Sequence, residues 1–254
     1  MSAAASAVAG AALAGLAAGL VNALAGGGSL ISFPALTALG LPPLVANLTN
    51  TVALTPGYFG AAWAQRRDLG QQGARCLWLV PLALAGGVAG GQLLLGSDER
   101  LFRALVPWLI LLGSALVALQ TPLRRWLSAS PMASGDAGVP LLAGALVAMA
   151  AVYGGYFGAG LSVILLGVLA ITLPDSLIRL NGLKQLLALA ANGGAALVFL
   201  ASGQVAWPPA LALALGALVG GGLGGRLAGR LAGESLRWWV VALGTAIGLW
   251  FLWR

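Results

Sequence analysis

The stretch NALAGGGSLISFPAL (residues 22–36) places three consecutive glycines inside a long apolar segment. Inside a helix, each glycine costs about 1 kcal/mol relative to alanine. An asparagine precedes the glycines, a serine follows them, and a proline comes six residues later. The segment therefore predicts a helix that breaks where its backbone most needs internal hydrogen bonds.

The rest of the chain has the composition of a membrane protein. Of its 254 residues, 60% are hydrophobic and 7% are charged, whereas soluble domains carry about 25% charged residues. Apolar runs recur along the chain at residues 8–25, 74–95, 102–119, 139–152, 186–201, 209–223 and 236–253. Because a spanning helix needs about 20 apolar residues, we expect an all-α, multi-pass membrane protein with about 8–10 transmembrane segments. The first run lacks the positively charged start of a signal peptide.

Charge and residue usage exclude several function classes. The net charge of +7 comes from arginines in short loops, which are topology signals rather than a nucleic-acid surface. The chain has one cysteine and no histidine, so a metal site of the usual type is not expected. No Walker motif or Ser/His/Asp set is present, and no carboxylate lies deep in an apolar run. We therefore expect no enzyme activity, no cofactor and no metal.

A second stretch resembles the first. GYFGAGLSVI (155–164) matches the glycine break, and LNGLKQ (180–185) matches ANLTNT (46–51). In this alignment Gly28 pairs with Gly160, Asn47 with Asn181, and Asn50 with Lys184. A duplicated architecture follows, with one membrane repeat at 1–119, a connecting loop at 120–138 and a second repeat at 139–254.

The glycine break leaves two topologies open. If residues 6–40 form one bent span, the repeats are parallel and the arginines divide evenly between the two sides. If the chain turns back, the return segment is re-entrant, because about 12 residues extend only about 18 Å as a helix. The repeats are then inverted and both termini lie outside. The positive-inside rule favours this second topology, since it puts nine arginines on one side: Arg66, Arg67, Arg75, Arg124, Arg125, Arg179, Arg226, Arg230 and Arg237.

The paired breaks are the first candidate site. Matched interruptions in repeat-built transporters point to the substrate, and a helix that starts after a break directs free N–H groups at an anion. For Asn22 and Asn192 two roles are equally compatible with the sequence: contacting the ligand, or capping a broken helix. Tyr58, Tyr153 and Tyr156 are candidate lining residues, although tyrosine is as typical of packing. The stripes GGVAGGQ (86–92) and GALVGGGLGGRLAG (216–229) predict close helix packing instead.

Lys184 is the second candidate. It is the only lysine, and an ionisable group within a membrane segment is a functional hypothesis by default. The alternative is a side chain that reaches towards the membrane interface. As a fixed cation beside asparagines and break amides, Lys184 suits an anionic substrate.

Together, ALAGGGSLISFPALTALGLPPLVANLTNTVALTPG, GGYFGAGLSVI, LNGLKQLLALAAN and FLASGQVAW…GGLGGRLAGRL resemble the TauE/SafE sulfite exporter family. The resemblance implies a secondary transporter of sulfite, sulfoacetate, other organosulfonates or similar small anions in the bacterial inner membrane, most often an exporter. The residues at the motif positions are Gly26, Gly27, Gly28, Ser29, Asn47, Thr49, Asn50, Gly158, Gly160, Asn181, Lys184 and Asn192.

The leading hypothesis is an alternating-access anion transporter with Lys184 as the counter-charge. An anion channel-like pore, or an importer of a different small anion, is the alternative. The expected partners are a small anionic substrate and the lipid bilayer, with no nucleic acid. The sequence leaves a homodimer open.

Overall fold

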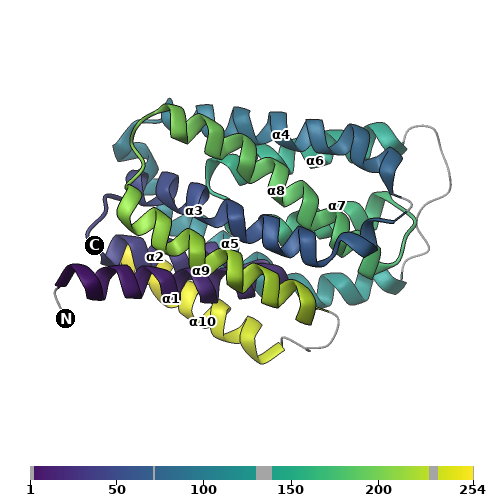
Figure 1. Ribbon diagram of the computed structural model, residues 1–254. Helices are drawn as coiled ribbons and strands as arrows, with labels where there is room; N and C mark the ends of the chain where they lie inside the picture. Colours follow the sequence, from purple (N-terminus) through teal and green to yellow (C-terminus); the bar gives the residue numbers. More distant parts are fainter. Residues whose placement is uncertain (1–2, 71, 130–138, 229–233, 254) are drawn as a thin grey trace.

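The computed structural model describes residues 3–70, 72–129, 139–228 and 234–253. Within this part the chain is a bundle of helices without strands (Figure 1). The first half comprises α1 (Ala3–Leu24), α2 (Ser29–Ala38), α3 (Pro43–Ala64), the 3-10 helix η1 (Arg66–Leu69), α4 (Gly73–Leu95) and α5 (Glu99–Ala129). The second comprises α6 (Val139–Tyr156), α7 (Leu161–Thr172), α8 (Leu177–Ala201), α9 (Trp207–Leu227) and α10 (Glu234–Trp253).

Helix α5 extends into the segment that was expected to connect the halves. Residues 120–129 belong to this helix, and residues 130–138 lie outside the described residues. Both proline positions of α5, Pro107 and Pro122, lie inside the helix.

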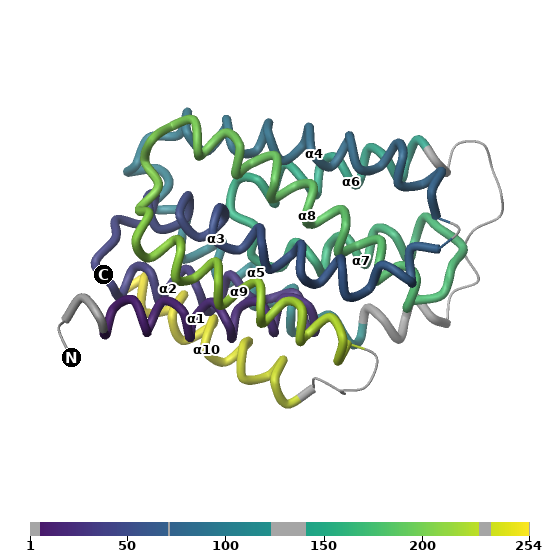
Figure 2. The backbone as a smooth tube through the Cα atoms, in the orientation of Figure 1, coloured from purple at the N-terminus to yellow at the C-terminus, as the bar shows by residue number. Residues whose placement is uncertain are grey.

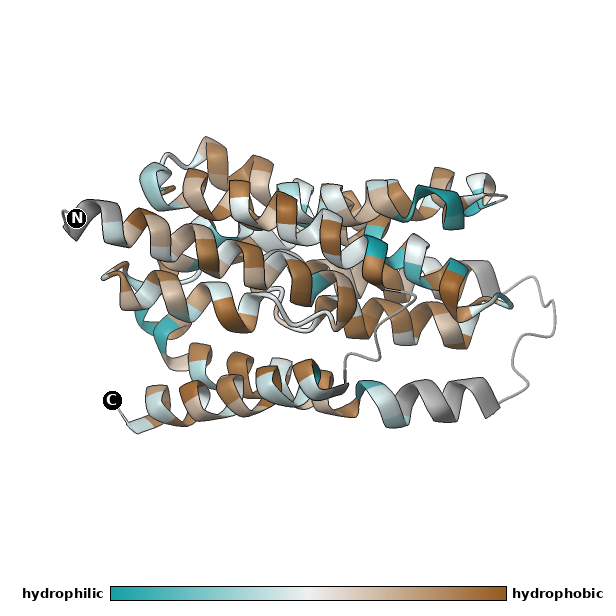
Figure 3. Ribbon diagram, turned by 60° about the horizontal axis from the view of Figure 1, so that its bottom comes forward, coloured by the Kyte–Doolittle hydropathy of each residue, from teal (hydrophilic) through white to brown (hydrophobic). Residues whose placement is uncertain are grey.

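The helices have the length and polarity of membrane spans. Six described helices are long and apolar enough to cross a bilayer, namely α1, α4, α5, α8, α9 and α10. Figure 3 shows brown, hydrophobic residues along the helices, with hydrophilic residues gathered mostly near one end. The predicted all-α polytopic membrane protein is therefore confirmed. Helix α3 is not among the six, because its asparagines and threonines lower its hydropathy. Of these residues Asn47, Thr49, Asn50 and Thr51 are buried in the protein.

The chain turns back at the first glycine break. The N–H groups of Ala25 and Gly26 both donate to Val21 O, and Gly26 has a φ of +77°. Gly28 then lies against α1, so closely that a methyl group there would overlap the carbonyl oxygen of Ala18. A single bent span is thereby excluded. With 10 residues, α2 extends only about 15 Å, the length of a re-entrant segment.

The second break repeats this reversal. Helix α6 ends at Tyr156 and α7 begins at Leu161, and the turn between them is visible near the centre of Figure 2. Gly158 and Gly160 have φ values of +80° and +79°, a region that side chains other than glycine rarely adopt. The two glycines permit the turn. Gly158 repeats the conformation of Gly26, whereas Gly160 differs from its aligned partner Gly28, which has a φ of −58°.

Glycine stripes bring helix backbones into direct contact, as the sequence predicts. Methyl groups at Gly216 and Gly220 of α9 would overlap the carbonyl oxygens of Ala12 and Leu16 of α1. Numbering rises together in both helices, so α1 and α9 run parallel. Helices α4 and α6 make the equivalent parallel contact, as do α3 with α9 and α4 with α8.

The contacts also have a regular pattern between the halves. Exchanging α1 to α5 for α6 to α10 converts each of these pairs into another one that is present: α1–α9 becomes α6–α4, and α3–α9 becomes α8–α4. Counterparts in this exchange also run in opposite directions, since α3 ends at the end of the bundle where α8 begins (Figure 1). An inverted repeat would produce both features, and they therefore support the predicted inversion. The inverted repeat itself stays a prediction.

The charged residues mark the two ends of the bundle. Helix α3 ends, and α4 and α8 begin, at what we call the arginine end, which carries Arg66, Arg67, Arg75 and Arg179. The side chains of Arg124, Arg125 and Arg230 lie outside the described residues. At the opposite end, where α1 begins and α10 finishes, α5 starts with Arg100 and Arg103.

Gly194 and Gly193 provide a test of the glycine contacts. A methyl group at Gly194 would overlap Leu84 O, whereas one at Gly193 meets nothing within 4 Å. We expect Gly194→Ala to destabilise the protein by about 1–3 kcal/mol, the typical cost of overpacking. Gly193→Ala is the matched control and should leave the thermal midpoint in detergent unchanged or higher. Equal midpoints for both variants would contradict the packing.

Candidate functional site

The two glycine breaks meet inside the bundle. A methyl group at Gly26 in the first break would lie only 2.6 Å from Ser162 Cβ, just past the second break. The hydroxyl of Tyr58, on α3, lies here beside the side chains of Asn22, Ser162 and Asn192. We call these four residues the central polar cluster. None of them is more than 5% exposed, so the cluster is closed to both ends in this conformation.

The cluster offers hydrogen-bond donors. Helices α2 and α7 begin beside it, and among the described residues the backbone N–H groups of Ser29 and Ser162 donate no hydrogen bond. The Ser162 hydroxyl, 1% exposed, lies beside the Tyr58 hydroxyl and makes no hydrogen bond of good geometry in the described part of the chain. Asn22 Oδ1 accepts a 3.0 Å hydrogen bond from Gly28 N, which leaves its amide NH2 as a donor. The backbone N–H groups without acceptors, the Asn22 side-chain amide and the positive ends of two helix dipoles together favour an anion.

The carboxyl ends of the broken helices are held by the opposite half. Asn47 Nδ2, on α3, donates to Tyr156 O at the end of α6, at 2.9 Å. Gln185 Nε2, on α8, donates to Ala23 O near the end of α1, at 3.2 Å. Carbonyl groups freed by the breaks thus find partners without water. The sequence analysis does not single out Gln185, although its place directly after Lys184 in the matched stretch LNGLKQ is a usable signal.

Lys184 is buried within the bundle at 1% exposed. Its Nζ donates to Asn181 Oδ1 at 2.9 Å, and Asn181 Nδ2 donates to Gln65 Oε1 at 2.6 Å. This chain runs from Lys184 towards the end of α3 at the arginine end. Because Lys184 precedes Asn192 by eight residues, it lies about 12 Å from it along α8. The ammonium group is thus between the central polar cluster and the arginine end.

The other predicted residues fall into three groups. Gly27, Gly28, Gly158 and Gly160 shape the turns, and Gly160 packs against Leu116 of α5. Thr49 lies apart, since its Oγ1 accepts from Ala206 N just before α9. Asn50 is 1% exposed, and its Oδ1 has no partner among the described residues.

Two of the candidate tyrosines, Tyr153 and Tyr156, are not members of the central polar cluster. The Tyr153 hydroxyl donates to Ala159 O at 2.6 Å, which closes the turn between α6 and α7. The Tyr156 hydroxyl lies 3.2 Å from Ser97 Oγ. Tyr58 is the tyrosine that reaches the central polar cluster, and Asn22 is both a cap and a cluster member.

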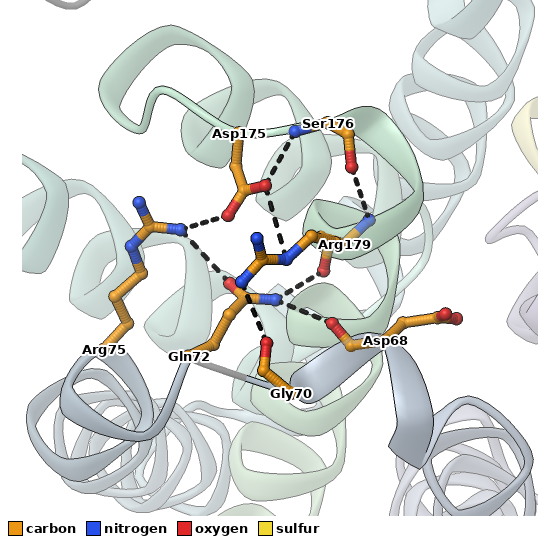
Figure 4. Close-up of polar contacts among 7 residues, drawn as sticks. All are labelled: Asp68, Gly70, Gln72, Arg75, Asp175, Ser176 and Arg179. Atoms are coloured by element: carbon orange, nitrogen blue, oxygen red, sulfur yellow. Dashed lines mark hydrogen bonds and ion pairs between the residues drawn. The ribbon is translucent and has the colours of Figure 1, made fainter.

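At the arginine end, a polar network joins the loops of the two halves (Figure 4). Asp175, which precedes α8, accepts from Arg75 of α4 at 2.6 Å and lies 3.5 Å from Arg179 Nε. Gln72 Nε2 donates to Arg179 O at 2.9 Å, and Arg179 donates to Gly70 O at 2.8 Å. The Asp175 side chain is 9% exposed. The loop between α3 and α4 is thereby fixed to the start of α8.

Comparison with known proteins identifies the family. The model of the family described as sulfite exporter TauE/SafE matches residues 11–251. The chain belongs to the TauE/SafE family. A "Probable membrane transporter protein" of Haemophilus influenzae is 29% identical over 80% of this chain and 78% of its own length. A "Probable membrane transporter protein ORF9" of Sinorhizobium sp is 27% identical over 78% of this chain and 74% of its own. No solved structure matches.

Membership agrees with the fold. This TauE/SafE protein is a multi-pass membrane protein and a membrane transporter. Two members of its central polar cluster, Ser162 and Asn192, lie in segments on which the resemblance rests, and Asn22 and Tyr58 directly flank a third such segment, residues 23–57.

The network at the arginine end can be tested at Asp175. Asp175→Asn removes the negative charge that faces Arg75 and Arg179, and should destabilise the protein by about 1–2 kcal/mol, since Arg75 is 27% exposed and partly screened. Glu99→Gln is the matched control, because the Glu99–Arg103 pair is 50% and 65% exposed. Thermal midpoints in detergent measure both. If Glu99→Gln lowered the thermal midpoint as much as Asp175→Asn, the stabilising role of the Asp175 network would be contradicted.

Proposed function

We propose that this protein carries a small anion, of the sulfite or organosulfonate class, through an alternating-access cycle centred on the two glycine breaks. The observation that carries the proposal is the meeting of Gly26 with Ser162 beside Tyr58, which combines two helix amino ends with buried donors in one place. The family description names sulfite for relatives of this chain, and the donor-rich cluster suits an oxyanion of that size.

The chemistry of the cluster favours oxyanions over neutral solutes. A sulfite or sulfonate group presents three acceptor oxygens, and the Ser162 hydroxyl, the Asn22 amide and the free N–H groups are donors. Hydrogen bonds to a charged acceptor are about twice as strong as neutral ones. An apolar surround strengthens them further, because water is excluded.

Lys184 supplies the positive charge in this proposal. Its ammonium group lies about 12 Å from Asn192 along α8, on the side of the cluster that faces the arginine end. From there it attracts an anion moving between the cluster and that end, and Asn181 orients it. A fixed buried charge is costly in a bilayer and is found where it serves transport.

The packing supports alternating access. The closed cluster is the occluded state, and movement of one half against the other opens it to each end in turn. By the positive-inside rule the arginine end faces the cytoplasm, which puts both termini outside and fits the bacterial inner membrane. Transport from the arginine end outwards is export.

Ser162 tests the anion site. Removal of its hydroxyl in Ser162→Ala should weaken anion binding about tenfold, equivalent to one charge-assisted hydrogen bond. Binding is measured as the thermal shift of purified protein with sulfite, thiosulfate, sulfate, sulfoacetate and taurine. Ser114→Ala is the matched control, since Ser114 is also 1% exposed and its hydroxyl donates within its own helix to Ile110 O. Undiminished binding by Ser162→Ala would remove this serine from the site.

Lys184 tests the counter-charge. We expect Lys184→Met to reduce flux of the binding anion in proteoliposomes to the background level, and Lys184→Arg to retain part of it. Because methionine preserves the length of the side chain without its charge, expression and thermal midpoint should persist. Full flux in Lys184→Met would refute the role. Flux that saturates and shows counterflow identifies a carrier, and single-channel currents would refute alternating access.

A further inference from the structure

Three buried amide oxygens remain without hydrogen bonds in the described part of the chain: Asn47 Oδ1, Asn50 Oδ1 and Gln185 Oε1. Their residues are at most 1% exposed. An amide oxygen only accepts, so an anionic substrate cannot satisfy any of them. Leaving such atoms unpaired in an apolar interior is costly, and they call for a donor or a cation.

Two of these oxygens lie on one face of α3. Asn47 and Asn50 are three residues apart, a spacing that brings side chains together on a helix. Asn47 also reaches the carboxyl end of α6, where its Nδ2 donates to Tyr156 O at 2.9 Å. The carboxyl end of a helix is the negative end of its dipole and stabilises a positive charge.

The second half shows what occupies the matched position. There Asn181 pairs in the alignment with Asn47, and Lys184 pairs with Asn50. The Lys184 ammonium donates to Asn181 Oδ1 at 2.9 Å, so an asparagine oxygen on α8 is satisfied by a positive charge that belongs to the chain. On α3 the equivalent oxygen, Asn47 Oδ1, has no partner among the described residues, and the position of the lysine is taken by another acceptor, Asn50 Oδ1.

We propose that a monovalent alkali cation binds at Asn47 and Asn50 beside the end of α6, and does on α3 what the Lys184 ammonium does on α8. A neutral set of amide and carbonyl oxygens suits Na⁺ or K⁺, because hard cations take oxygen ligands and a single charge needs no carboxylate. Discontinuous helices of transporters place such ions at the carboxyl ends of half-helices. Gln185 is the poorer place, since its neighbour Lys184 already supplies a positive charge.

The test uses the full purified chain without any sulfur anion, so that it is independent of the proposed substrate. Thermal midpoints are compared in NaCl, KCl and choline chloride at equal concentration, which keeps chloride and ionic strength constant. We expect a rise of a few degrees in NaCl or KCl relative to choline chloride, because an ion that binds only the folded state stabilises it. Identical midpoints in all three salts would overturn the proposal.

Variants then locate the site. Asn50→Leu removes one oxygen and should abolish the salt-specific shift. Asn50→Lys supplies an ammonium at the position matched to Lys184, and should abolish the shift while raising the midpoint in choline chloride above that of Asn50→Leu. Thr55→Val is the matched control on the same helix, because the Thr55 hydroxyl donates to Thr51 O, and it should keep the full shift.

A full shift in Asn50→Leu would place the cation elsewhere and overturn the proposal. If Asn50→Lys fails to fold, the salt comparison on the unmodified protein and the response of Asn50→Leu still test the cation site. A salt-specific shift without any anion binding would reject the proposed function and keep the cation site. Anion binding without a salt-specific shift would do the reverse.

Discussion

In a bilayer, every backbone N–H and C=O group that a helix does not use must find a partner inside the protein. The two glycine breaks free such groups at four helix ends: the carboxyl ends of α1 and α6 and the amino ends of α2 and α7. The carboxyl ends are satisfied across the molecule, by Asn47 on Tyr156 O and by Gln185 on Ala23 O. The amino ends of α2 and α7 keep free N–H groups beside Tyr58 and Ser162. The candidate site follows from this difference between the two kinds of helix end.

The same constraint assigns opposite signs to neighbouring regions. Amino ends with hydroxyl and amide donors attract negative charge, whereas carboxyl ends with unpaired amide oxygens attract positive charge. The two kinds of end lie on either side of each glycine turn. An anion and a cation can therefore be accommodated close together, where the apolar surround would penalise either of them alone.

Much of the fold was predictable because the signals were local. Low charge and repeated apolar runs predicted the spanning helices, the arginines favoured the turned-back topology, and AGGGS and FGAGLS predicted the breaks. Contacts between distant segments were not predictable. Ser162 and Gln185 look like ordinary polar residues until Gly26 and Ala23 are placed against them. Thr49 shares the motif of Asn47 and Asn50, yet faces Ala206, because one or two residues along a helix change the direction of a side chain.

The parallel contact between α1 and α9 also bears on how the chain is assembled during synthesis. The small-residue face of α1 is shaped to fit the backbone of α9, and lipid tails fit it poorly. Translation from residue 24 to residue 207 takes roughly 10–40 s at about 5–20 residues per second. During that interval the first helix is inserted without its principal neighbour. Release of the nascent chain before α9 emerges leaves α1 without the close backbone contacts that the glycines of the two helices permit.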